Sequence, residues 1–181
     1  NYCSNTLLAN STWLSAIANS SYIESVMNIK VPTMTSNTEP SGEVIFDSQY
    51  RDTTQSYYGY YAFDNNYNNT SRPYSVWSST LAPTDVTTGG QYIGYMFPNA
   101  RNIKCFKWYP DQEQGAPSGA TINVNLEYSN DGTNWTSLRS FSLASDVTYD
   151  IKSYANNQSH KYWRLYETSA SFTKRYVKSK G

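Results

Sequence analysis

The sequence predicts an all-β fold, a jelly-roll β-sandwich of about eight short strands behind a short N-terminal helical connector. The composition is the first reason, because 18 Tyr, 5 Trp and 6 Phe stand in a background rich in Ser, Thr and Asn. These residues favour half-buried pleated surfaces over helices. The second reason is a series of short strand-like segments after residue 42, separated by turn residues.

The helical connector is expected within residues 11–28, where apolar residues from Trp13 to Val26 recur at helical spacing. Ser21 and Glu24 form a capping-box pattern, so two short helices are expected there. The following residues up to Gly42 hold two prolines and small polar residues, which is typical of a linker. The predicted organisation is a connector and linker at 1–42 and one compact domain at 43–181.

Strands are expected in eight segments, at 43–47, 76–79, 91–97, 102–109, 121–129, 135–143, 148–151 and 161–167. The clearest is 121–129, in which Ile122, Val124 and Leu126 alternate with polar residues, the pattern of a strand with one buried face. An Asn-Asp-Gly-Thr turn at 130–133 predicts a hairpin with the next strand, because Gly132 supplies a positive φ.

Charge, apolar runs and cysteine content exclude several classes of partner and site. The chain has 14 basic and 14 acidic residues and no basic stripe, so nucleic acid is not expected as a partner. It has no apolar run of the length that a membrane span needs, so membrane insertion is not expected. Cys3 and Cys105 fit no zinc spacing and are expected to be free thiols. The chain begins without a leader and is expected to be a piece of a longer protein.

Several motifs, in this order along the chain, resemble the discoidin or coagulation-factor type C domains. The stretch Ala-Phe-Asp-Asn-Asn at 62–66 resembles the family's Ala-x-Asp-Gly-Asn, and the hairpin segment 126–135 resembles its Tyr-Ser-x-Asp-Gly-x-x-Trp. Segments 76–78, 91–97, 103–108 and 162–165 are similar to other strands of the family. The likeness covers about residues 43–168 and implies a galactose-binding-like jelly roll, shared with many carbohydrate-binding modules. The lead-in at 20–42 is similar to that of such modules in bacteriophage tail and tail-fibre proteins.

The resemblance implies a structural calcium near the Asp-Asn-Asn loop. Calcium needs several oxygen ligands, and the matching positions are Asp64, Asn66, Thr70 and Glu167. Asn65 stands where the family has Gly, and the loop at 67–74 is longer than the family pattern. The alternative is a metal-free loop held by Asx-turn hydrogen bonds.

The ligand is expected at one end of the sandwich. Consecutive loops of an antiparallel sandwich alternate between its ends, which groups 48–57, 81–90, 110–120 and 144–147. The family resemblance implies that this end carries the ligand. Rings and planar polar groups in these loops suit a sugar, and the candidates are Tyr50, Arg51, Tyr57, Asp85, Tyr109, Asp111 and Gln112. Taken singly, each is more readily explained as a solvated loop residue than as a ligand contact. Four of the tryptophans are expected in strand packing instead.

The predicted function is a non-catalytic binding module, a receptor-recognition domain of a phage tail fibre or similar surface appendage that attaches to a cell-surface glycan. An enzyme is not expected, because His160 is the only histidine and is expected at the opposite end from the ligand loops. One alternative is a structural domain of a virion or secreted complex that packs on neighbouring subunits, for example as a homotrimer. Another is the accessory module of a secreted bacterial glycoside hydrolase. Each reading implies an extracellular or virion location.

Overall fold

The computed structural model describes residues 31–49, 56–66, 77–78, 86–110, 119–144, 147, 149–174 and 178–179. In these segments antiparallel strands dominate, and the only helix is a single 3₁₀ turn. The predicted all-β class is therefore confirmed. The expected helices within 11–28 lie outside the described residues.

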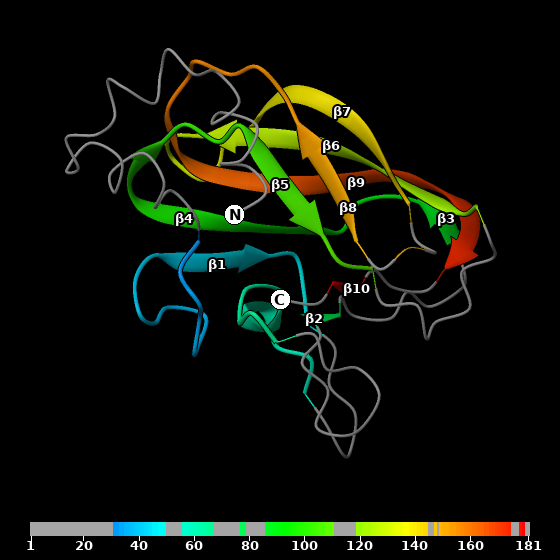
Figure 1. The fold of residues 1–181 in the computed structure, drawn as a ribbon, viewed down its shortest axis with the longest axis horizontal. Helices are drawn as coiled ribbons and strands as arrows, with labels where there is room; N and C mark the ends of the chain where they lie inside the picture. Colours follow the sequence, from blue (N-terminus) through cyan, green and yellow to red (C-terminus); the bar gives the residue numbers. More distant parts are fainter. Residues whose placement is uncertain are drawn as a thin grey trace, which may run out of the picture.

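One six-stranded antiparallel sheet forms the larger layer of the fold (Figure 1). Its strands lie in the order β1-β4-β9-β6-β7, and β3 pairs with the far part of β9. The bounds are β1 (Glu43–Phe46), β3 (Val86–Thr88), β4 (Tyr92–Arg101), β6 (Thr121–Ser129), β7 (Thr136–Ala144) and β9 (His160–Lys174). Strand β9 is central, because it pairs with β4 on one side and β6 on the other.

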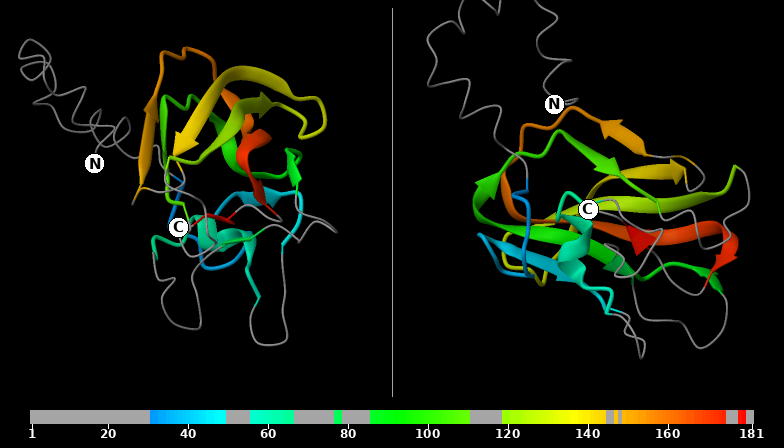
Figure 2. Two further views of the ribbon diagram at one scale, coloured as in Figure 1. Left: turned by 90° about the vertical axis from the view of Figure 1, so that its right-hand side faces the viewer. Right: turned by 60° about the horizontal axis from the view of Figure 1, so that its bottom comes forward.

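Smaller elements form the second layer. Strand β5 (Cys105–Trp108) pairs with β8 (Asp150–Ser153), and β2 (Trp77–Ser78) pairs with β10 (Lys178–Ser179). The 3₁₀ turn η1 (Gly59–Ala62) lies beside β1 and β2. Figure 2 shows β5 and β8 covering one face of the large sheet, which gives the predicted sandwich.

The core lies between the layers. On β6, Ile122, Val124 and Leu126 are all buried, as the alternation predicts. They face buried residues of the other strands, among them Trp108 and Trp163, whose side chains are 3% and 4% exposed. The prediction that these two tryptophans serve packing is confirmed.

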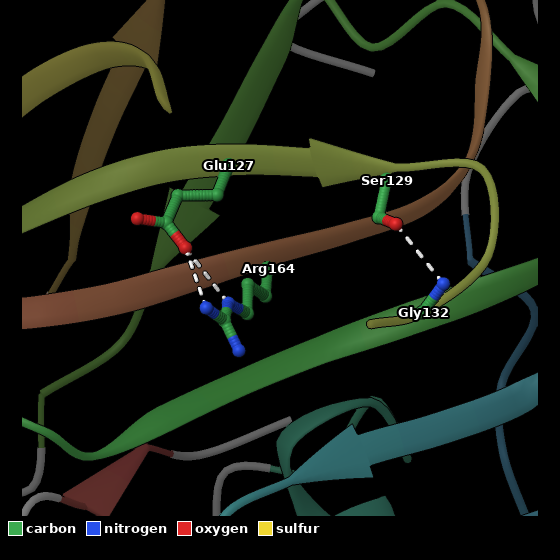
Figure 3. A network of polar contacts seen from close by, with 4 residues as sticks. All are labelled: Glu127, Ser129, Gly132 and Arg164. Atoms are coloured by element: carbon green, nitrogen blue, oxygen red, sulfur yellow. Dashed lines mark hydrogen bonds and ion pairs between the residues drawn. The ribbon is translucent and has the colours of Figure 1, made fainter. Parts of the chain in front are cut away.

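The β6–β7 hairpin turn is held by side-chain hydrogen bonds (Figure 3). Ser129 Oγ accepts the backbone N–H groups of Asp131 and Gly132, at 3.2 and 3.0 Å. Gly132 has φ +76°, the left-handed conformation that the predicted turn requires. Asp131 in turn accepts the backbone N–H groups of Asn134 and Thr133, which hold the pKa of its carboxyl below the usual value.

The packed core reaches upstream of Glu43, the expected start of the domain. Met34 is 1% exposed and belongs to the core cluster, and its backbone N–H donates to Phe63 O at 3.0 Å. Asn37 ties the same segment to η1, because its Oδ1 accepts the backbone N–H of Tyr60 at 3.0 Å. Met34 and Asn37 therefore pack on the domain, although the polar, proline-containing composition of this segment is typical of a linker.

The expected strands agree with the observed ones most closely where alternation is clearest. Strand β6 has the predicted bounds, and β7 is displaced by one residue. Strands β4 and β9 run longer than expected, to Arg101 and Lys174, and β3 and β10 were not expected. Strand β8 begins two residues later than predicted, because Asp150 pairs with Trp108 at the end of β5.

The expectation of free thiols is wrong. Cys105 at the start of β5 is disulfide-bonded, and the described residues contain no free cysteine. The sequence holds one other cysteine, Cys3. Two cysteines about a hundred positions apart give no local spacing from which a bridge could be inferred.

We expect the two cysteines to be joined to each other. Alkylation of the denatured, unreduced chain should label no thiol, and alkylation after reduction should label both. Proteolysis without reductant should release one linked pair of peptides that contains Cys3 and Cys105. Recovery of two alkylated cysteines before reduction, or of a bridge between two chains, would contradict the prediction.

Candidate functional site

The sheet register brings the described residues that flank the predicted ligand loops to one end of the sandwich. The end of β1 meets the start of β4, where Asp47 Oδ1 accepts the N–H of Tyr92 at 3.1 Å. The end of β7 meets the start of β8, where Asp150 Oδ2 accepts the N–H of Ala144 at 3.1 Å. The predicted grouping of the loops is therefore confirmed for the described residues that flank them.

A cluster of two aromatic rings and one cation lies at this end, on the outer side of β5 and β8. The ring centroids of Tyr109 and Tyr149 are 5.8 Å apart. Lys107 Nζ lies over both rings, 4.6 Å from the centroid of Tyr109 and 3.9 Å from that of Tyr149. We call Lys107, Tyr109 and Tyr149 the loop-end cluster.

The sequence places these side chains by simple alternation. Lys107 follows Phe106 and precedes the buried Trp108, so its side chain points away from the core. Lys107 pairs with Ile151 and Trp108 with Asp150 in the β5–β8 register, so the residues just beyond this pair, Tyr109 and Tyr149, come together.

The loop-end cluster offers what a polyhydroxylated ligand needs. Tyr149 is 39% exposed and is the only large hydrophobic residue in the described segments that counts as exposed. Its ring can stack on an apolar sugar face, while the tyrosine hydroxyls and the lysine ammonium can bond to hydroxyl groups. Cation–π contacts hold the three groups together before a ligand arrives.

The seven predicted ligand residues differ in their location and burial. Tyr109 belongs to the loop-end cluster, whereas Tyr57 is buried at 6% exposure and presents no open ring. The other five, Tyr50, Arg51, Asp85, Asp111 and Gln112, lie outside the described residues. Lys107 and Tyr149 were missed, although antiparallel pairing of the expected strands 102–109 and 148–151 would have placed both beside Tyr109.

The loop at 64–66 forms an Asx turn, the structure expected for the metal-free alternative. Asp64 Oδ1 accepts the backbone N–H of Asn66 at 2.9 Å, an Asx turn. Asn65 has φ +57°, so asparagine takes the left-handed conformation that the family's glycine would take.

The fourth predicted ligand, Glu167, lies on the inward face of β9 and is 2% exposed. A buried carboxylate requires hydrogen bonds, a cation or protonation to offset its lost hydration. Its burial therefore fits a calcium ligand. The third predicted ligand, Thr70, lies outside the described residues. The described segments contain no cluster of three His, Cys, Asp or Glu side chains that could hold a metal ion. The predicted calcium site has only two acids, so this absence does not test it, and calcium stays a prediction.

His160 lies at the opposite end of the sandwich, as predicted. Its ring stacks on Tyr128 with centroids 3.8 Å apart, and Nδ1 is 3.0 Å from Asn130 Oδ1. Burial lowers the pKa of the imidazole. These contacts pack the histidine onto the β6–β7 hairpin, away from the loop-end cluster.

Comparison with protein families matches residues 45–181 to the F5/8 type C domain. A comparison with curated protein sequences returned no match. In the described part of the chain, no helix has the length and apolarity to cross a membrane.

Solved structures share the fold at low sequence identity. The CBM32-5 module of CpGH89 from Clostridium perfringens, in complex with GalNAc-β-1,3-galactose, is 14% identical, with a TM-score of 0.58 over 76% of this chain and 90% of that one. The family 32 module of C. perfringens NanJ, in complex with galactose, is 12% identical, with a TM-score of 0.54 over 76% and 88%. Chitosan-binding module 2 of a Paenibacillus sp. IK-5 chitosanase/glucanase, in complex with chitotriose, is 19% identical, with a TM-score of 0.53 over 76% and 91%.

We expect calcium to stabilise the native chain if the Asp64 loop and Glu167 hold it. A ligand that binds only the folded state adds about 2.7 kcal/mol at a concentration 100 times its Kd. Chelation with EGTA should then lower the melting temperature by several degrees, and added calcium should restore it. Glu167→Gln should abolish this response, whereas Glu43→Gln, at an exposed position of β1, should keep it. Identical melting curves with and without EGTA would support the metal-free loop.

Proposed function

The chain belongs to the F5/8 type C domain family, and from this premise we propose that it is a non-catalytic module that binds glycans on a cell surface. The observation that carries the proposal is the loop-end cluster. It joins an exposed ring, a second ring and a cation at the end of the sandwich where the loops converge.

The cluster favours a sugar over an anionic or apolar ligand. A single lysine held over two rings gives a weaker anion site than paired basic groups, because its charge is partly satisfied by the ring faces. Within the described residues, the exposed apolar surface at this end is one tyrosine ring, much smaller than the apolar patch that a membrane or an obligate protein partner needs. One stacking face with a few polar groups around it is instead the composition of a saccharide site.

The structural neighbours support this ligand class. Three of them are described in complex with GalNAc-β-1,3-galactose, galactose and chitotriose. They share the fold at 12–19% identity, so their ligands indicate a class of compound and not a specific sugar for this chain.

A binding role also agrees with the surroundings of two described acids, Asp150 and Glu167. Asp150 is paired with Lys152 at 2.9 Å and accepts the backbone N–H of Ala144, so its carboxylate is bound to structural partners. Glu167 faces the interior. Glycoside hydrolysis needs two carboxyl groups that flank the scissile bond, and neither of these carboxyls lies exposed beside the cluster.

For the biological setting we propose the receptor-recognition domain of a phage tail fibre or a similar extracellular appendage. The lead-in at 20–42 and its likeness to phage tail modules support this setting. An accessory module of a secreted glycoside hydrolase is the second candidate, and the fold similarity to the C-terminal domain of a Bacteroides fragilis chitobiase favours it. A domain that packs on neighbouring subunits, as in a homotrimer, would leave the loop-end cluster covered.

We expect the native chain to bind at least one immobilised glycan on an array that includes galactose, GalNAc-β-1,3-galactose and chitotriose. Tyr149→Ala should weaken that binding about tenfold or more, since removal of a central aromatic contact costs at least ~1–2 kcal/mol. Tyr149→Phe should retain most of the affinity because it keeps the ring. The measurements are array binding and titration calorimetry.

Matched charge variants test the role of the lysine. Lys107→Ala should weaken the same binding, whereas Lys104→Ala, an exposed lysine at the opposite end of the sandwich, should leave it unchanged. Thermal melting should show that all four variants are folded. The proposal fails if the wild-type chain binds no glycan, or if binding survives both Tyr149→Ala and Lys107→Ala undiminished.

A further inference from the structure

A second aromatic surface lies on the outer face of the large sheet, on the opposite side of the sandwich from the loop-end cluster. It consists of Tyr92, Trp135, Tyr162, Arg164 and Tyr166, which we call the outer-face strip. Trp163 and Leu165 of β9 pack in the core, so the residues between and beside them point outward. We propose that the outer-face strip is a second carbohydrate site, which binds an extended neutral glycan.

Arg164 is the centre of the strip. Its guanidinium carbon lies 3.9 Å from the ring centroid of Trp135, 4.6 Å from that of Tyr92 and 4.9 Å from that of Tyr166. Arg164 Nε and Nη2 also bond to Glu127 Oε2 at 2.8 and 2.7 Å (Figure 3). Three rings are thereby fixed around one planar group, so little side-chain entropy is lost when a ligand stacks on them.

The ion pair makes the strip neutral. Both partners are mostly buried, with side chains 13% and 11% exposed, and the carboxylate of Glu127 offsets the guanidinium charge. Among the described residues, the charges at its margins are of both signs: Lys161 lies over the Tyr162 ring at 5.8 Å, Asp47 is bonded to the backbone of Tyr92, and Glu43 lies on β1 in the same row as Tyr162. A ligand on this surface therefore gains nothing from carrying net charge.

Hydrogen-bonding side chains continue the strip across the sheet. The register places Tyr92, Tyr166, Asn125 and Ser140 in one row over four neighbouring strands. Asn125 and Ser140 are themselves joined by a 2.7 Å hydrogen bond and lie at the surface. Rings beside amide and hydroxyl groups suit a ligand with both apolar ring faces and many hydroxyls.

The size of the strip argues against a protein as the occupant. Tyr, Trp and Arg are also enriched at protein interfaces, but a specific interface buries about 800 Å² of each partner. Here the rings are half-buried and continue into the polar pair Asn125 and Ser140. The strip from Tyr162 to Tyr166 spans five residues of β9, and the steps between them add up to about 13 Å. That length suits several sugar units in a chain better than one.

The outer-face strip would bind glycans, the same ligand class as in the proposed function, but on a different surface from the loop-end cluster. The test uses galacto-oligosaccharides and N-acetylchito-oligosaccharides of two to six units, titrated into the ¹⁵N-labelled native chain. The hexasaccharides should shift the indole N–H signal of Trp135, in the wild type and in Tyr149→Ala. The signals of the buried Trp108 and Trp163 serve as internal controls and should not move.

A conservative variant provides the second measurement. Trp135→Phe keeps a ring over Arg164 and should remain folded, and it should weaken hexasaccharide binding about tenfold while disaccharide binding at the loop-end cluster is unchanged. If glycans bind but the Trp135 signal never moves, the outer-face site is wrong and the proposed function stands. If no saccharide binds, both are wrong. A Trp135 shift that depends on protein concentration without glycan would identify a second copy of the chain as the occupant and overturn the inference.

Discussion

The two-residue period of side chains along β9 is the constraint on which most of the molecule depends. This strand is paired on both sides, so each residue must point either into the core or out of the sheet. Trp163, Leu165 and Glu167 point inward, and Tyr162, Arg164 and Tyr166 point outward. A slip of one residue would bury the guanidinium and expose the tryptophan, so packing and surface chemistry are specified by the same register.

The two layers have different structural roles, and these roles follow from this register. The large sheet supplies most of the core and holds the strand ends in fixed positions, while β5 and β8 close the core with Trp108. The residues of the two proposed binding surfaces are those that the core excludes, Lys107 and Tyr109 on one side and Trp135 and Arg164 on the other. A fold can therefore persist at 12–19% identity while its ligands change, because the outward positions carry little of the packing energy.

The sequence was most informative where local patterns decide the structure. The alternation from Ile122 to Leu126 predicted β6 to the residue, and the Asn-Asp-Gly-Thr turn predicted the hairpin. Long-range contacts were not predictable in the same way. The packing of Met34 depends on Phe63, which only the folded domain brings beside it, and no local spacing predicts the disulfide of Cys105. Arg164 was missed for the same reason, since its partners come from other segments of the chain. Tyr149 is different, because pairing of the expected strands 102–109 and 148–151 would have placed it beside Tyr109.

The central claim is that the loop-end cluster contacts a sugar ring, and a crystal structure of the chain soaked or co-crystallised with a glycan identified by array binding tests it most directly. We predict that a pyranose ring stacks on Tyr149, with its hydroxyl groups bonded to Lys107 or Tyr109. A bound glycan whose sugar rings make no contact with these three residues would contradict the account.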